Sequence, residues 1–269
     1  MFSVFDSIVL GAVQGITEFL PISSSGHLII AREFLGISQE GSLAYDAILQ
    51  LATALAVLIY FRKDILELVY NLFETNKNAE KNRLTIFLIA GTIPAIIFGL
   101  LLQEQMETVF RSATLVAITL FIGSGIMFLA DKFLEYRTKN NLYSQQLTLG
   151  KSIIIGLFQC LALIPGMSRS GMTISGGYLL GLSKDFAVRF SFLLSIPIIA
   201  GSGFVKLIEV LRDTSILTVS FDVLIVGFIT SFVFGWVAID FLLKFLRTNT
   251  FTVFIVYRVL LVFLLLFLL

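Results

Sequence analysis

The sequence predicts an all-α protein that crosses a membrane several times. Hydrophobic residues make up 57% and charged residues 14% of the 269 residues, and the mean hydropathy is +0.97. A soluble chain of this length would need more polar residues to cover its surface. The apolar stretches approach the length of about 20 residues that a spanning helix requires, and they lack the alternation of barrel strands. We therefore expect helices in lipid, in a single membrane domain over 1–269.

Six stretches are predicted to cross the membrane. They cover residues 43–61, 84–102, 110–130, 186–205, 219–243 and 251–269. Lys and Arg concentrate in the polar stretches 62–83 and 132–151, whereas the loop 103–107 has none. Because basic loops stay in the cytoplasm, the first two should be cytoplasmic and the third should lie outside. The net charge of +1 and the lack of a basic run argue against nucleic acid as a partner.

An internal repeat divides the chain into two related parts. A shift of 145 residues aligns Gln14 with Gln159, the stretch 23–26 (SSSG) with 168–171 (SRSG), and Gly36 with Gly181. The alternative is a chance similarity between two apolar segments rich in glycine and serine. We predict repeats over 1–130 and 148–269, each with a re-entrant segment (4–36 and 151–183) and three crossings. An odd number of crossings between the copies would make this an inverted-topology repeat.

Both re-entrant segments are predicted to be broken helices. Pro21 disfavours continuation of a helix that starts near Val4, and the serines after it can cap a second helix. In the second copy, Pro165 and Gly166 interrupt the helix, and Ser168 or Ser170 can cap the next one. Irregular backbone at membrane depth is tolerated only when protein covers it or when it lines a wet cavity. The breaks therefore predict a polar chamber.

The first break carries four candidate functional residues. Gln14 and Glu18 are four positions apart and should share a helix face near a C-terminal end, where a cation is favoured. Glu18 is thus a candidate metal ligand or base. Ser24 and His27, the only histidine, are three apart at a helix start, where free N–H groups attract anions. We expect this serine and this imidazole to lie side by side.

The second break contributes a cation. Arg169 lies between Ser168 and Ser170, with Thr173 one turn further on, and its guanidinium suits phosphate oxygens. A simpler explanation is a buried ion pair between Arg169 and Glu18 that only holds the two copies together. The hydroxyls could likewise serve capping and packing. In the final crossing, Arg258 is expected to snorkel or to pair with an acid.

Two long motifs resemble those of the undecaprenyl-diphosphate phosphatase family of the bacitracin-resistance type. They are the stretch 14–27 (QGITEFLPISSSGH) and the stretch 165–173 (PGMSRSGMT), and the likeness extends to the closing pair Tyr257 and Arg258. The resemblance implies an enzyme of the bacterial plasma membrane that opens to the outer, periplasmic side. It would convert undecaprenyl diphosphate to undecaprenyl phosphate and inorganic phosphate, recycling the carrier lipid for cell-wall synthesis. It also implies a divalent cation, Mg²⁺ or Ca²⁺.

The family's site residues carry over by position. The resemblance implies that Glu18, Ser24, His27 and Arg169 are catalytic and that Glu18 binds the metal. The candidate substrate-binding residues around them are Gln14, Ser23, Ser25, Ser168, Ser170 and Thr173. The family accepts Glu or Gln at the first place of its acidic motif, and Gln14 leaves this chain with one carboxylate there. We expect Ser24 to attack phosphorus while His27 handles its proton, or water to attack with His27 or Glu18 as base.

Other functional classes fit parts of the same pattern. Inverted repeats with broken helices are typical of secondary transporters, so a carrier or flippase for a lipid phosphate or an anion is the main alternative. A structural subunit that binds lipid head groups would use the arginine and leave the histidine without a role. A polyprenyl diphosphate and membrane lipids are the expected partners, and the sequence leaves monomer and homodimer open.

Overall fold

The computed structural model describes residues 2–37, 42–73, 79–102, 105, 112–140, 142, 146–212 and 219–268. Every regular element in this part of the chain is a helix. The helices are α1 (Val4–Phe19), α2 (Ser24–Leu35), α3 (Ser42–Tyr60), α4 (Arg62–Phe73), α5 (Ala79–Leu101), α7 (Ala113–Lys139), α8 (Leu149–Leu161), α9 (Arg169–Leu179), α10 (Lys184–Arg212), α11 (Phe221–Thr248) and α12 (Thr252–Leu268). The loop 103–107 lies outside the described residues, apart from Gln105.

Several helices are long and apolar enough to cross a bilayer. Within the described residues there are four, namely Arg83–Leu101, Ala113–Lys139, Lys184–Arg212 and Phe221–Thr248. A fifth span results if α3 and α4, which meet at an angle of 72°, are counted together. The last predicted crossing corresponds to α12, an apolar helix of 17 residues. The all-helical membrane fold is confirmed at this level, and the count of six crossings stays a prediction.

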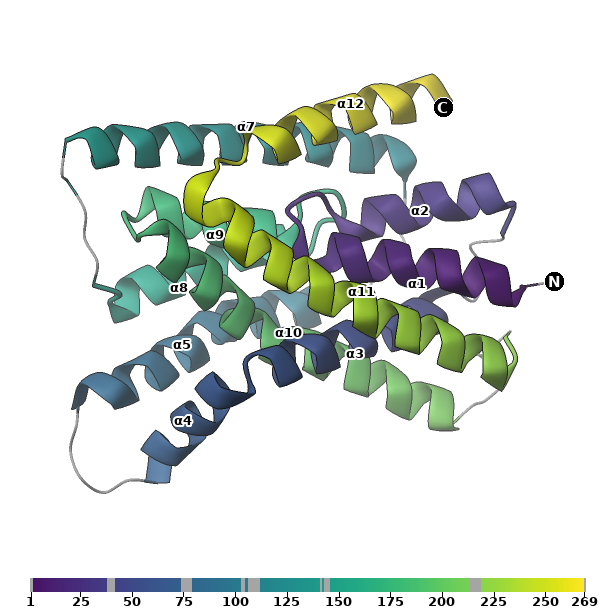
Figure 1. Cartoon of the computed structure of the whole chain (residues 1–269), viewed down its shortest axis with the longest axis horizontal. Helices are drawn as coiled ribbons and strands as arrows, with labels where there is room; N and C mark the ends of the chain where they lie inside the picture. The colour runs from purple at the N-terminus through teal and green to yellow at the C-terminus, as the bar shows by residue number, and fades with distance from the viewer. Residues whose placement is uncertain are drawn as a thin grey trace.

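Two helix pairs turn back in the middle of the bundle (Figure 1). α1 and α2 pack against each other and extend from the middle towards the end where the N-terminus lies. α8 and α9 also pack together, and they extend towards the opposite end. Each pair therefore places its connecting segment deep inside the molecule. The residues that the sequence analysis selected as site residues lie in these two segments or within two helical turns of them.

The two breaks have the same unusual backbone. α1 ends at Phe19, just before Pro21, as predicted, and α8 ends at Leu161. Ser23 and Ser168 have φ angles of 74° and 70°, and they are the only described residues other than glycine with positive φ. Such a conformation is strained for a serine. It recurs at positions that the 145-residue shift aligns, just before α2 and α9.

Close helix packing holds the broken helices in place. A Cβ added at Gly11 of α1 would lie 2.7 Å from the carbonyl oxygen of Gly227 in α11. The aligned residue Gly156 of α8 likewise lies against the backbone of Gly91 in α5. Small residues let helix backbones approach closely in membranes. The N-terminal half of each broken pair is thus fixed against a long apolar helix.

Arg258 of α12 connects the two breaks. Its side chain is fully buried, and its Nη1 donates to the carbonyl oxygen of Pro21 at 3.3 Å. Its Nη2 donates to the carbonyl oxygens of Gly166 at 2.9 Å and Leu120 at 3.0 Å, and its Nε to Ser124 Oγ at 3.0 Å. The expectation that Arg258 snorkels or pairs with an acid is wrong. The broken helices leave carbonyl groups without helical partners, and the guanidinium satisfies one from each break.

Arg258→Lys is expected to destabilise the fold. A guanidinium offers five donors in a fixed fork, whereas an ammonium offers three donors on one atom that cannot reach both breaks. Two lost charged hydrogen bonds correspond to about 3–5 kcal/mol and to a Tm that is roughly 5–10 °C lower. Scanning fluorimetry of the detergent-purified protein measures this shift. Arg212→Lys, at an exposed position, is the control. Equal Tm values for both variants would contradict the conclusion that Arg258 holds the two breaks together.

Candidate active site

Glu18 and Gln14 form the first part of the site. They lie on the last turns of α1, and Gln14 Nε2 donates to Glu18 Oε2 at 2.9 Å. The predicted shared helix face is therefore confirmed. Gln14 is fully buried, and its Oε1 has no hydrogen-bond partner. One acceptor oxygen thus remains beside the carboxylate.

Arg169 brings the second break to the first. It is the first residue of α9, and its Nη2 lies 2.6 Å from Glu18 Oε1, across a separation of 151 residues in sequence. The side chains of Arg169 and Glu18 are 15% and 8% exposed, so the pair is largely shielded from solvent. One nitrogen of the guanidinium contacts the carboxylate in this way. The geometry fits both the ion-pair explanation and an anion site.

Ser24 completes the cluster around Glu18. It is the first residue of α2, and its Oγ donates to Glu18 Oε2 at 2.7 Å. The carboxylate therefore accepts hydrogen bonds from Ser24, Gln14 and Arg169. Glu18, near the C-terminal end of α1, thus contacts the first residues of α2 and α9. The N-terminal ends of these two helices favour anions.

His27 is oriented by two other partners. Its Nδ1 lies 2.7 Å from the carbonyl oxygen of Ser23, and its Nε2 lies 2.6 Å from the hydroxyl of Tyr257 in α12. No hydrogen bond of the described structure joins His27 to Ser24, whose hydroxyl donates to Glu18. The expected contact between serine and imidazole is thus replaced by a contact between serine and carboxylate. Tyr257 was not selected as a site residue, although it precedes Arg258 in an otherwise apolar segment.

The remaining predicted residues bond within the protein. Ser23 Oγ accepts a hydrogen bond from the backbone N–H of Gly166 at 3.1 Å and lies 3.2 Å from Ser25 Oγ. Ser168 Oγ lies 3.3 Å from Ser170 Oγ and accepts from Gly171 N, which confirms the predicted cap of α9. Thr173 Oγ1 lies 2.5 Å from Ser191 Oγ.

Exposure separates two groups among these residues. The side chains of Ser23, Ser168, Ser170 and Thr173 are buried, as is Gln14. Glu18, Ser24, Ser25, His27 and Arg169 keep some exposure. The four residues predicted to be catalytic therefore belong to the partly exposed set.

Within the described part of the chain, no group of three or more His, Cys, Asp or Glu residues lies close enough to hold an ion. Mg²⁺, however, is commonly held by one or two carboxylates together with phosphate oxygens of the substrate. Glu18 and the free Oε1 of Gln14 fit such a partial site.

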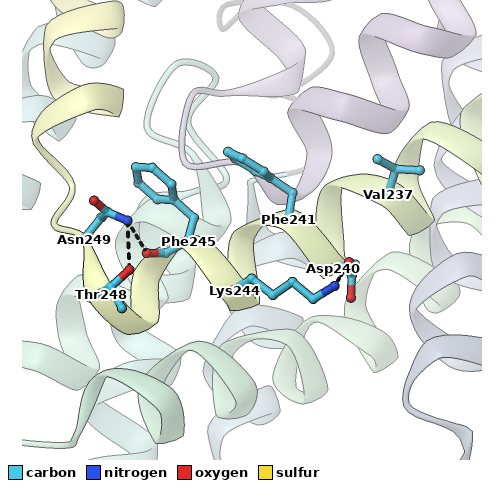
Figure 2. A pocket seen from close by; sticks show the side chains of 7 residues that line it. All are labelled: Val237, Asp240, Phe241, Lys244, Phe245, Thr248 and Asn249. Atoms are coloured by element: carbon cyan, nitrogen blue, oxygen red, sulfur yellow. Dashed lines mark hydrogen bonds and ion pairs between the residues drawn. The ribbon is translucent and has the colours of Figure 1, made fainter.

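A hollow on the surface of α11 lies apart from this cluster (Figure 2). Its lining consists of Val237, Asp240, Phe241, Lys244, Phe245, Thr248 and Asn249. Its polar groups pair with one another, since Lys244 Nζ lies 2.6 Å from Asp240 Oδ2 and Asn249 Nδ2 donates to Phe245 O at 3.0 Å. None of the predicted site residues lines it.

Comparison with known proteins gives a consistent result. The chain matches the family described as bacitracin resistance protein BacA over residues 7–264. A protein from Moorella thermoacetica named undecaprenyl-diphosphatase is 42% identical over 261 residues, covering 96% of this chain and 95% of its own length. Another of that name, from Myxococcus xanthus, is 44% identical over 262 residues and is covered to 86%. This chain, with its two broken helix pairs meeting at Glu18 and Arg169, belongs to the BacA family.

Proposed function

We propose that this protein hydrolyses undecaprenyl diphosphate to undecaprenyl phosphate and inorganic phosphate. The reaction recycles the carrier lipid for cell-wall synthesis and accounts for bacitracin resistance. Relatives named undecaprenyl-diphosphatase match nearly the whole chain at about 40% identity, for example 42% and 44%. The observation that carries the proposal is the Glu18 carboxylate, which contacts Arg169 of one break and Ser24 of the other. This arrangement joins a nucleophile to an anion-binding cation.

Arg169 and the helix starts would bind the diphosphate. The guanidinium has five N–H donors, and its contact with Glu18 uses one nitrogen, so other donors can face phosphate oxygens. The first backbone N–H groups of α2 and α9 have no partner within their own helix, so these ends favour an anion next to Ser24 and Arg169. Binding of the diphosphate would also weaken the contact between Arg169 and Glu18, because the diphosphate and the Glu18 carboxylate are both anions that compete for the same guanidinium.

Ser24 is proposed to attack the terminal phosphorus. The new bond joins Ser24 Oγ to phosphorus, the bond to the bridging oxygen breaks, and undecaprenyl phosphate leaves. The hydroxyl proton passes to Glu18 Oε2, its hydrogen-bond acceptor at 2.7 Å. Phosphoryl transfer relies mainly on positioning and charge stabilisation. Water then attacks the phosphoserine while His27 takes its proton. The bond between phosphorus and Ser24 Oγ breaks, Glu18 returns its proton to Ser24 Oγ, and inorganic phosphate leaves.

A second route omits the covalent intermediate. Water attacks the terminal phosphorus directly while His27 or Glu18 accepts its proton, the bond to the bridging oxygen breaks, and undecaprenyl phosphate leaves. In either route a divalent cation, Mg²⁺ or Ca²⁺, would be held by Glu18 and the Oε1 of Gln14 and would supply neutralisation of phosphate charge. The chain's own residues keep the tasks of orienting the lipid head group and moving protons.

The proposed architecture is an inverted repeat with six crossings in the plasma membrane. Three features support it: the shared positive φ at Ser23 and Ser168, the paired carbonyl contacts of Arg258, and the opposite directions of the two helix pairs in Figure 1. The C-terminal ends of α7 and α11 and the N-terminal end of α8 lie at the same end of the bundle. They carry Arg137, Lys139, Lys151 and Arg247, so this end would be cytoplasmic and α1 and α2 would open to the outer face.

Phosphate release in detergent distinguishes the enzyme from a carrier. The purified protein, mixed with undecaprenyl diphosphate and Mg²⁺, is expected to release inorganic phosphate at a kcat of roughly 1–1,000 s⁻¹. A transporter or a head-group-binding subunit has no reason to cleave the lipid in micelles. The Arg169→Ala variant is the control for a contaminating phosphatase, because only the protein's own activity would fall. Equal release by the two proteins would reject the proposal.

A further inference from the structure

We propose that Tyr257 of α12 is a positioning residue for His27. It is separated from His27 by 230 residues in sequence, yet its hydroxyl lies 2.6 Å from His27 Nε2. The two rings lie nearly parallel, with an angle of 8° between their planes. This inference rests on the proposed function only in that His27 takes part in the reaction.

The two contacts of the imidazole determine which nitrogen carries its proton. The Ser23 carbonyl oxygen can only accept a hydrogen bond, so the neutral ring must carry its proton on Nδ1. Nε2 is then the nitrogen with the free electron pair, and the Tyr257 hydroxyl donates to it. The basic nitrogen of His27 is therefore both defined and held in one direction, and a proton from water reaches it through the Tyr257 hydroxyl, which gives its own proton to Nε2 as it accepts one.

The placement of Tyr257 is fixed by its neighbour in sequence. Arg258 is fully buried and donates to carbonyl oxygens of both breaks, at Pro21 and Gly166. These contacts tie α12 to the segment that also holds the Ser23 carbonyl. The Tyr257 hydroxyl and the Ser23 carbonyl thus hold the imidazole of His27 by its two ring nitrogens. Tyr257 itself is 42% exposed. Tyr257 holds the base and does not contact Glu18, Ser24 or Arg169 in any hydrogen bond of the described structure.

The single histidine allows a direct test by solid-state ¹⁵N NMR. In wild-type protein labelled with ¹⁵N-histidine and reconstituted in lipid, we expect a protonated Nδ1 and an unprotonated Nε2 that accepts a hydrogen bond. Tyr257→Phe removes only the hydroxyl, so the Nε2 resonance should move to the position of a nitrogen without a donor. In phosphate-release assays the same variant should lose about tenfold in kcat, part of what general acid–base catalysis contributes, with KM within about twofold.

Tyr60→Phe is the matched control. It removes a phenol hydroxyl that donates to Asp240 at 3.0 Å, away from His27, and should change neither the resonance nor kcat. A proton on Nε2 in the wild type, or an Nε2 resonance that Tyr257→Phe leaves in place, would overturn the proposed contact. A moved resonance with unchanged kcat would overturn the positioning role. If His27→Ala keeps full activity, the proposed role of His27 fails, whereas the resonance still reports the contact with Tyr257.

Discussion

Ser24→Ala is expected to lower kcat for undecaprenyl diphosphate by roughly 10³-fold or more, with the protein still folded. The substitution removes the attacking oxygen. It also removes one hydrogen bond to Glu18, whose carboxylate keeps Gln14 and Arg169 as donors. Phosphate release by the detergent-purified variant measures the effect, and the melting temperature shows that the fold is kept.

Ser25→Ala is the matched control for this experiment. Ser25 is a neighbouring, partly exposed serine whose Oγ lies 3.2 Å from Ser23 Oγ and makes no hydrogen bond to Glu18 in the described structure. Its loss should change kcat only a few-fold. Full activity of Ser24→Ala would eliminate the serine as nucleophile and leave direct attack by water, whereas equal losses at both positions would point to a packing role for the serines.

Glu18→Gln has the second large expected effect, on both activity and stability. The variant leaves the Arg169 guanidinium largely buried beside a neutral amide. Breaking a buried ion pair in this way costs about 3–5 kcal/mol, and the exposure of 8–15% puts this pair close to that class. Activity should fall by roughly 10²-fold or more because the proton acceptor of Ser24 is lost. Thermal unfolding and phosphate release are measured on the same sample.

Exchange of the charges at positions 18 and 169 distinguishes an ion pair that only stabilises the fold from one that takes part in catalysis. The double variant Glu18→Arg with Arg169→Glu restores opposite charges across the two breaks. If the pair only holds the copies together, both stability and activity should return. We expect part of the stability to return and activity to stay at the level of the single variants, because the cation then lies at the end of α1 and away from the start of α9. Recovered activity would contradict the proposed division of roles.

Local features of the site could be predicted because they depend on short-range geometry. The spacing of Gln14 and Glu18 on one helix face follows from the helical period, and the end of α1 before Pro21 follows from the proline ring. The serine cap of α9 at Ser168 is also a local preference. The contact between Glu18 and Arg169 could be predicted from one further rule, which is that ionisable residues at membrane depth tend to pair with one another.

Contacts between residues far apart in sequence could not be predicted, because they depend on how the helices pack. Arg258 lies in an apolar helix where an arginine suggests a counter-ion, and nothing in its neighbours indicates that carbonyl oxygens from two breaks satisfy it. The hydroxyl of Tyr257 reaches His27 only through the packing of α12 on the rest of the bundle. The strained φ angles of Ser23 and Ser168 are equally hidden, because serine has no special preference for that conformation. Spacing alone suggested that Ser24 would face His27, but the carbonyl of Ser23 turns the imidazole elsewhere.

A structure of the Ser24→Ala variant with undecaprenyl diphosphate bound tests the central claim most directly. The claim is that the two broken helix pairs form one phosphate site between Glu18 and Arg169. We expect the terminal phosphate within hydrogen-bonding distance of the Arg169 guanidinium, with its phosphorus facing the former position of Ser24 Oγ. A diphosphate bound elsewhere, for example in the hollow on α11, with the contact between Glu18 and Arg169 unchanged, would contradict it.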